Sequence, residues 1–197
     1  MSLSNEMQGF YSTWLANADS YRGNAVNEYY NKAYSLFTLY NRLYGEATFT
    51  LAREGHIKIQ DNRPFPDSKG AIQYAPQFIG YDEILQILTK DDECNNSINS
   101  LIALIENETF YIKLSMPYGE GQPKKDQILL KKLKSNEAKT KVTAILDLIY
   151  SVRCNMVHGN KGFDPIQVKL LKPVTIILRK IIETLFDKLY SHPNTNP

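Results

Sequence analysis

The feature that most constrains the fold is one long stretch of apolar residues at helical spacing. Between residues 24 and 54 these side chains recur every three or four positions, at Val26, Tyr29, Tyr30, Ala33, Leu36, Phe37, Tyr40, Leu43, Tyr44, Ala47 and Leu51. This spacing places them along one side of an α-helix. We expect a single helix there, with Asn24 as its N-cap and Gly55 just beyond its end. Such a helix must bury its apolar side against other elements.

Shorter helices are expected on both sides of this segment. Apolar spacing predicts helices over residues 5–21, 82–90 and 92–106, and over a stretch that begins near Ser135 and ends at 158. Asp164 followed by Pro165 is typical of a helix start, and the last helix should run to about Tyr190. Pro173 is expected to kink or split that helix.

The remaining segments carry Pro and Gly and are expected to be irregular. These are residues 56–80, with a short extended stretch at 57–59, and residues 108–123; the tail 191–197 should fray. The resulting count is roughly five to seven helices with no repeated strand pattern, so the expected class is all-α, a bundle. We expect one domain over 1–197, with an insertion-like irregular region at about 56–123.

Cysteine content and hydropathy bear on the cellular compartment. The two cysteines, Cys94 and Cys154, cannot form a disulfide framework, which favours a reducing environment. The first residues lack the basic and apolar regions of a secretory signal, and no run approaches 18 apolar residues. We therefore expect a cytoplasmic protein without a membrane segment.

Charge is divided unevenly along the chain, although the net charge is only +2. Residues 1–120 carry 9 Lys/Arg and 15 Asp/Glu, whereas residues 121–197 carry 14 and 6, so the net charges are −6 and +8. A basic half can mark a nucleic-acid-binding face. It is equally typical of a solvated, lysine-rich helix surface.

Arg153 is the residue whose position most needs an explanation. At about 100° per residue it falls near 20° from Val142, inside the apolar stripe of its predicted helix. A guanidinium cannot lose its charge there, and an unpaired buried charge is very costly. It can pair with an acid of a neighbouring helix, reach water at the helix end, or hold a phosphate, which suits its planar fork.

His158 lies five residues further on, at the predicted C-terminus of the same helix. The helix dipole favours its charged form there. It can cap the last carbonyl groups or act as an acid and base. Side chains five residues apart on a helix point about 140° apart, so Arg153 and His158 converge only if the helix ends there or if two copies meet.

The residues around this pair resemble a known family. YSVRCNMVHGNKGF, residues 150–163, resembles the signature of HEPN domains, in which four to six residues separate an Arg from a following His at the end of a late helix; here the gap is four residues. LFTLYNRLYGEAT, residues 36–48, is similar to the aromatic-rich early helix of several HEPN subfamilies. The resemblance covers about half of the chain. It implies a HEPN-like helical bundle with irregular insertions between the early and late helices.

The resemblance also implies a function. Many HEPN proteins are metal-independent ribonucleases that act as homodimers, often as toxins or in defence. By this similarity Arg153 would hold the scissile phosphate of RNA, and His158 would move protons for attack by the 2′-hydroxyl. No cofactor is implied, no metal site is expected from three scattered histidines, and an antitoxin or another protein is a possible partner.

The match to the family pattern is incomplete. A polar residue, often Asn, commonly follows the Arg, but here Cys154 stands in that place and Asn155 comes next, so Asn155 is the candidate for the polar role. Cys154 is expected to pack rather than to act as a nucleophile. Asn41 and Tyr44 share a helix face and can reach the site, or they can pack. RNA-backbone contacts are expected from lysines of the basic segment, Lys124, Lys125, Lys131, Lys132, Lys134 and Lys161.

Two other functions agree with the same residues. A non-catalytic HEPN module would bind RNA, a nucleotide or a partner protein without cleavage. A structural dimer would use Arg153 and His158 for hydrogen bonds at its interface. No phosphate-binding loop of the Walker or Rossmann type is present.

Overall fold

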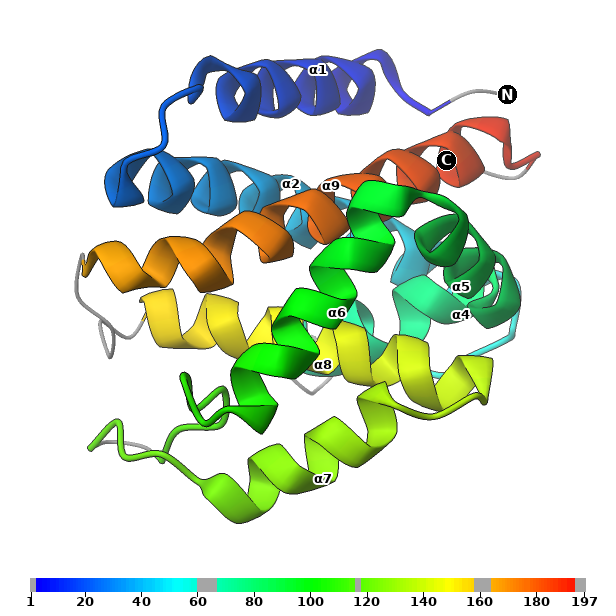
Figure 1. Ribbon diagram of the computed structural model, residues 1–197. Helices are drawn as coiled ribbons and strands as arrows, with labels where there is room; N and C mark the ends of the chain where they lie inside the picture. The colour runs from blue at the N-terminus through cyan, green and yellow to red at the C-terminus, as the bar shows by residue number, and fades with distance from the viewer. Residues whose placement is uncertain (1–2, 60–66, 116–117, 158–163, 194–197) are drawn as a thin grey trace.

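The computed structural model describes residues 3–59, 67–115, 118–157 and 164–193, and these residues form a helical bundle (Figure 1). The elements in chain order are α1 (Asn5–Ser20), α2 (Val26–Arg53), α3 (Asp67–Lys69), the π-helical turn η1 (Gly70–Tyr74), α4 (Ala75–Ile79), α5 (Tyr81–Lys90), α6 (Asp92–Glu106), α7 (Pro123–Leu133), α8 (Ala138–Val157), the 3-10 turn η2 (Pro165–Gln167) and α9 (Val168–Ser191). The predicted all-α class is confirmed. Within the described ranges, β pairing is limited to an isolated bridge between Leu114 and Gly121.

The core forms where α2 and α9 pack against each other. Leu36 and Leu43 of α2 and Leu178 and Ile182 of α9 are fully buried, as the apolar spacing of both helices requires. In Figure 1, α1 lies over α2, α6 crosses α9 at a steep angle, and α7 runs along the lower edge. No helix in the described part of the chain combines the length and the apolar character of a membrane span.

Helix starts follow the predicted capping in some places and not in others. Asp164 accepts a hydrogen bond from the backbone N–H of Ile166, as expected for its cap position. Asn24 is not a cap, because α2 begins at Val26 after Ala25, which offers no side-chain hydrogen bond. Helix α8 begins at Ala138, three residues after Ser135.

Pro173 does not split the last helix, which continues through it from Val168 to Ser191. A proline removes a single backbone donor, and burial of the surrounding apolar side chains offsets that loss.

The prediction of irregular structure across 56–80 was wrong for its second half. Residues 67–79 are helical, and Pro76 is the second residue of α4, which follows η1 without a break. Gly80, at φ 113°, separates α4 from α5 without an intervening loop. The Pro and Gly residues therefore mark boundaries between short helices. The extended stretch expected at residues 57–59 is not a strand. The basic segment after residue 122 forms α7. Residues 194–197 of the tail lie outside the described residues.

Candidate functional site

Arg153 lies near the end of α8, beside the buried stripe of that helix. Val142, Ile145, Ile149 and Val152 are buried, as the helical wheel predicted. The Arg153 side chain is 29% exposed, so part of it reaches solvent. An arginine in this state can bind an anion that arrives from solvent.

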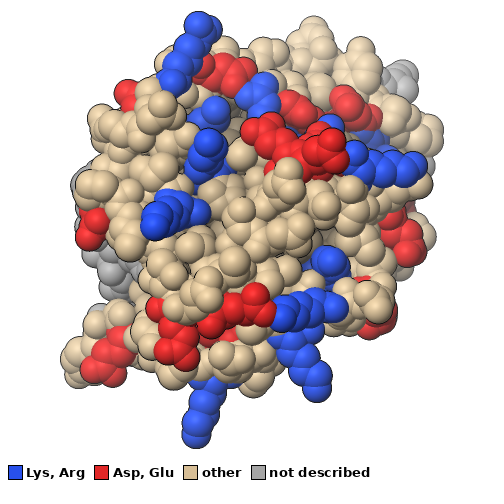
Figure 2. All heavy atoms as spheres, viewed as in Figure 1, with Lys and Arg blue, Asp and Glu red and all other residues tan. Residues whose placement is uncertain are grey.

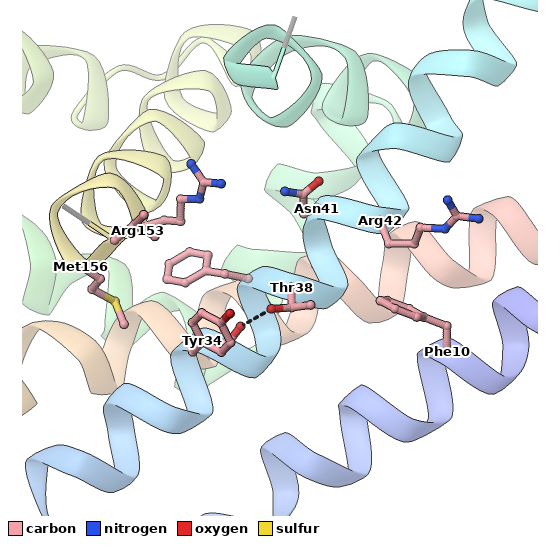
Figure 3. A pocket seen from close by; sticks show the side chains of 9 residues that line it. Phe10, Tyr34, Thr38, Asn41, Arg42, Arg153 and Met156 are labelled. Atoms are coloured by element: carbon pink, nitrogen blue, oxygen red, sulfur yellow. Dashed lines mark hydrogen bonds between the residues drawn. The ribbon is translucent and has the colours of Figure 1, made fainter. Parts of the chain in front are cut away.

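Arg153 borders a groove of about 500 Å³ that opens across the surface of α2 (Figure 3). Helix α2 forms the floor, α1 contributes Phe10 on one side, and the end of α8 closes the other side. The lining residues are Phe10, Tyr34, Phe37, Thr38, Asn41, Arg42, Arg153, Met156 and Val157. The groove thus combines aromatic rings with two arginines and one side-chain amide.

Asp67 is the acidic partner of Arg153. Its carboxylate lies 3.7 Å from Nη1 of Arg153 and accepts hydrogen bonds from the hydroxyl groups of Tyr150, at 2.8 Å, and Tyr44. The guanidinium also lies 5.7 Å from the centre of the Tyr150 ring. The structural ion pair considered from the sequence is therefore present, at a distance longer than that of a charge-assisted hydrogen bond.

Protonation in this network follows from burial and from the Asp67 charge. Burial, followed by the hydrogen bond to Asp67, raises the pKa of Tyr44 and of Tyr150 well above that of a free phenol. Burial alone would lower the pKa of Arg153, but the Cys154 side chain and Asp67 raise it. Both phenols are therefore donors at neutral pH, and Arg153 is a cation.

The two candidates on α2 occupy different parts of this site. Asn41 is exposed and lines the groove together with Arg153. Tyr44 is buried, and its hydroxyl donates to Asp67, the acidic partner of Arg153. Their spacing of three residues predicted that both would lie near Arg153. In the structure Asn41 lines the groove, whereas Tyr44 lies in the core and donates to Asp67.

Asn155 is not in the groove. It is buried, and its side-chain amide donates a hydrogen bond to the backbone oxygen of Ile112 at 3.0 Å. The same segment is held by Lys113, whose ammonium donates to Asp147 at 2.7 Å and to Ser151 at 2.8 Å. Asn155 thus anchors residues 110–115 on α8, and the catalytic role that we expected for it has no geometric support.

Replacement of Asn155 with alanine is expected to lower the free energy of unfolding by about 1–3 kcal/mol, because the buried Ile112 carbonyl loses its donor. Urea denaturation monitored by circular dichroism measures this change, with the exposed Asn31→Ala variant as control. If Asn155→Ala instead has the free energy of unfolding of the wild-type protein but loses RNA cleavage, Asn155 acts in the active site.

His158 and Lys161 lie outside the described residues. Val157, directly before His158 in the sequence, is the last residue of α8, is 58% exposed and lines the groove.

The remaining candidate lysines lie on or next to α7. Lys124, Lys125, Lys131, Lys132 and Lys134 are exposed, and Lys134 pairs with Glu106. None of them lines the groove beside Arg153. Figure 2 shows basic side chains projecting from the lower edge of this face, where α7 lies, with acidic groups next to them. The basic half of the sequence therefore does not produce a surface of one sign on this face.

Asp67, Phe10 and Tyr34 are among the site residues that were missed from the sequence. Asp67 falls in a segment that lacks any local signal, and only the fold brings it to Arg153. Phe10 is one of several apolar residues in its helix. Tyr34 is 61% exposed and falls outside the apolar stripe of α2, and an aromatic residue at such a position is a signal that could have indicated it.

In the described ranges, few side chains are arranged for metal binding or for thiol chemistry. No group of three or more His, Cys, Asp or Glu side chains there could hold a metal ion. Both cysteines are free thiols, and burial, followed by the charge of Asp91, raises the pKa of Cys94 to about 12. That thiol is therefore protonated and unreactive at neutral pH.

Comparisons with protein-family models, with curated proteins and with solved structures found no match to this chain.

Proposed function

We propose that this protein is a metal-independent endoribonuclease of the HEPN type that acts as a homodimer. The observation that carries the proposal is the position of Arg153. Its side chain lines a groove that is open to solvent near the end of α8, and Arg153 precedes His158 by five residues in the sequence. The Arg-x4-His pattern and its resemblance to HEPN domains supply the reaction class.

The proposed chemistry uses the RNA's own 2′-hydroxyl. His158 accepts the proton of this hydroxyl as its oxygen attacks phosphorus, and the bond from phosphorus to the 5′-oxygen of the next nucleotide breaks. Arg153 donates hydrogen bonds to the phosphate oxygens, whose negative charge grows in the transition state. The departing 5′-oxygen takes a proton, so the products are a 2′,3′-cyclic phosphate and a 5′-hydroxyl end.

A cleavage assay in EDTA tests the proposal. Labelled single-stranded RNA should be cut by the wild-type protein, and the products should carry cyclic-phosphate ends. His158→Ala should lose this activity, whereas His56→Ala, which removes an exposed histidine at the end of α2, should keep it. Absence of cleavage by the wild-type protein, or full cleavage by His158→Ala, rejects the nuclease.

One observation favours a second candidate, a HEPN module that binds RNA without cutting it. Asp67 already offers a carboxylate to Arg153 at 3.7 Å, so the guanidinium is partly neutralised in the free protein. Such a module would bind RNA in a salt-dependent manner and release no products.

The lysines of α7 make a separate prediction for either function. If they contact the RNA backbone, the Lys131→Ala/Lys132→Ala variant should bind more weakly, and the slope of log affinity against log salt should fall by about 1–1.5. Fluorescence anisotropy across a salt series measures the slope. The Lys58→Ala/Lys90→Ala variant, with two exposed lysines removed elsewhere, is the control. An unchanged slope in the α7 variant means that these lysines only solvate the surface.

A further inference from the structure

The groove beside Arg153 has the size of a small-ligand site. Its volume of about 500 Å³ exceeds what a phosphate needs, and Arg153 lies at one wall only. An RNA phosphate held by Arg153 would therefore leave most of the groove free for the rest of the same nucleotide.

The walls of the groove suit a flat ring. Phe37 is almost fully buried beneath it, whereas the Tyr34 ring is 61% exposed and Phe10 of α1 lies on the far side. A single exposed aromatic side chain needs no explanation. Three aromatic side chains beside two arginines, however, are the combination with which proteins bind single-stranded nucleic acid, where the bases stack on side-chain rings.

Asn41 adds a polar group that can read a base. Thr38 next to it is already engaged, because its hydroxyl donates to the backbone oxygen of Tyr34 at 2.9 Å (Figure 3). The Asn41 amide makes no hydrogen bond to another residue in the described part of the chain. It offers one acceptor and two donor hydrogens, a set that can pair with the edge of a nucleobase.

We propose that this groove binds one unstacked nucleobase of the RNA, next to the phosphate held by Arg153, and that Asn41 sets the base preference. The inference rests on the proposed function. It specifies the substrate as single-stranded RNA, because a base inside a duplex cannot enter the groove. Tyr34 and Phe37 supply stacking and apolar contact, and the amide of Asn41 distinguishes one base edge from another.

Substrates with a single cleavable position test this inference. Each is a DNA oligonucleotide with one ribonucleotide, so only that sugar carries the attacking 2′-hydroxyl. One set varies the base of the ribonucleotide, and a second set varies the base that follows it. The wild-type protein should prefer some bases over others by about 10-fold or more in one of the sets.

The variants separate recognition of the base from folding. Asn41→Asp replaces the donor with a second acceptor and should change the order of preference among the four bases, whereas Asn31→Asp, an exposed change on the same helix, should not. Tyr34→Ala should lower kcat/KM for all four bases by about 5- to 100-fold. An identical order of preference in Asn41→Asp and wild-type protein overturns the inference.

Two further measurements distinguish failure of the base-binding site from failure of the proposed nuclease activity. If the wild-type protein cuts nothing, anisotropy with the same oligonucleotides measures affinity. A base-dependent affinity that Asn41→Asp alters supports the groove while rejecting the nuclease. If Tyr34→Ala instead converts a dimer into a monomer in light scattering, a second copy of the chain covers the groove and the base site is rejected.

Discussion

Replacement of Arg153 with alanine is expected to lower the rate of RNA cleavage by about 10²- to 10³-fold, the usual effect of losing one donor to the charge that develops in a transition state. Arg153→Lys should recover only part of the activity, because an ammonium keeps the charge but lacks the planar fork. Single-turnover cleavage of labelled RNA measures both variants.

The loss should not reflect unfolding. The pair with Asp67 spans 3.7 Å between side chains that are 29% and 37% exposed, so it contributes on the order of 0–1 kcal/mol after solvent screening. Asp67 keeps Tyr44 and Tyr150 as donors in the variant. The thermal midpoint should therefore change little, and Arg22→Ala, an exposed arginine outside the groove, is the control for activity. Full activity in Arg153→Ala would remove the basis of the proposed function.

Mixing two inactive variants should restore activity if the site is shared between two copies of the chain. In a heterodimer of Arg153→Ala and His158→Ala, one site combines the intact arginine of one protomer with the intact histidine of the other. Random mixing of a symmetric dimer makes half of the dimers heterodimers, each with one working site, so about a quarter of the wild-type activity should return. Cleavage after co-refolding of the two variants measures this recovery.

The control for this experiment mixes Arg153→Ala with the double variant that lacks both residues. This pair cannot assemble an intact site and should stay inactive. If the Arg153→Ala and His158→Ala mixture also stays inactive although mass measurements show heterodimers, each active site lies within one protomer and the composite arrangement is wrong.

The sequence predicted the helices well wherever apolar periodicity was sustained. The stripe of α2 is buried in the core from Ala33 to Leu51, and the stripe of α8 placed Arg153 at the edge between core and solvent. Residues 67–79 were missed, because several short helices in succession never show enough turns for a period to emerge. Pro76 and Gly80, which mark their boundaries, look the same in a sequence as loop residues.

For the site, too, the sequence indicated some residues and missed others. The sequence indicated Arg153 because a permanent charge within an apolar helix stripe must find a partner or solvent. This conflict is visible from the spacing of the residues alone. Asn155, two residues later, was also a candidate for a catalytic role, yet it donates to Ile112, 43 positions earlier in the chain. The Asp67 carboxylate that accepts from Tyr150 is 83 positions away. Contacts between residues this far apart in the sequence cannot be predicted from the residues that neighbour either partner.

The amino-acid sequence by itself determined that the long segments with sustained apolar spacing are helical, which side of each of them is buried, and that an arginine stands where burial and charge conflict. These properties repeat along the chain every few residues, so neighbouring residues suffice to reveal them. The tertiary structure alone decided that Arg153 has Asp67 beside it and an aromatic groove in front of it, and that Asn155 lies in another pocket. Such pairings depend on how helices pack across the bundle, and packing is a balance of contacts between residues that are distant in the chain.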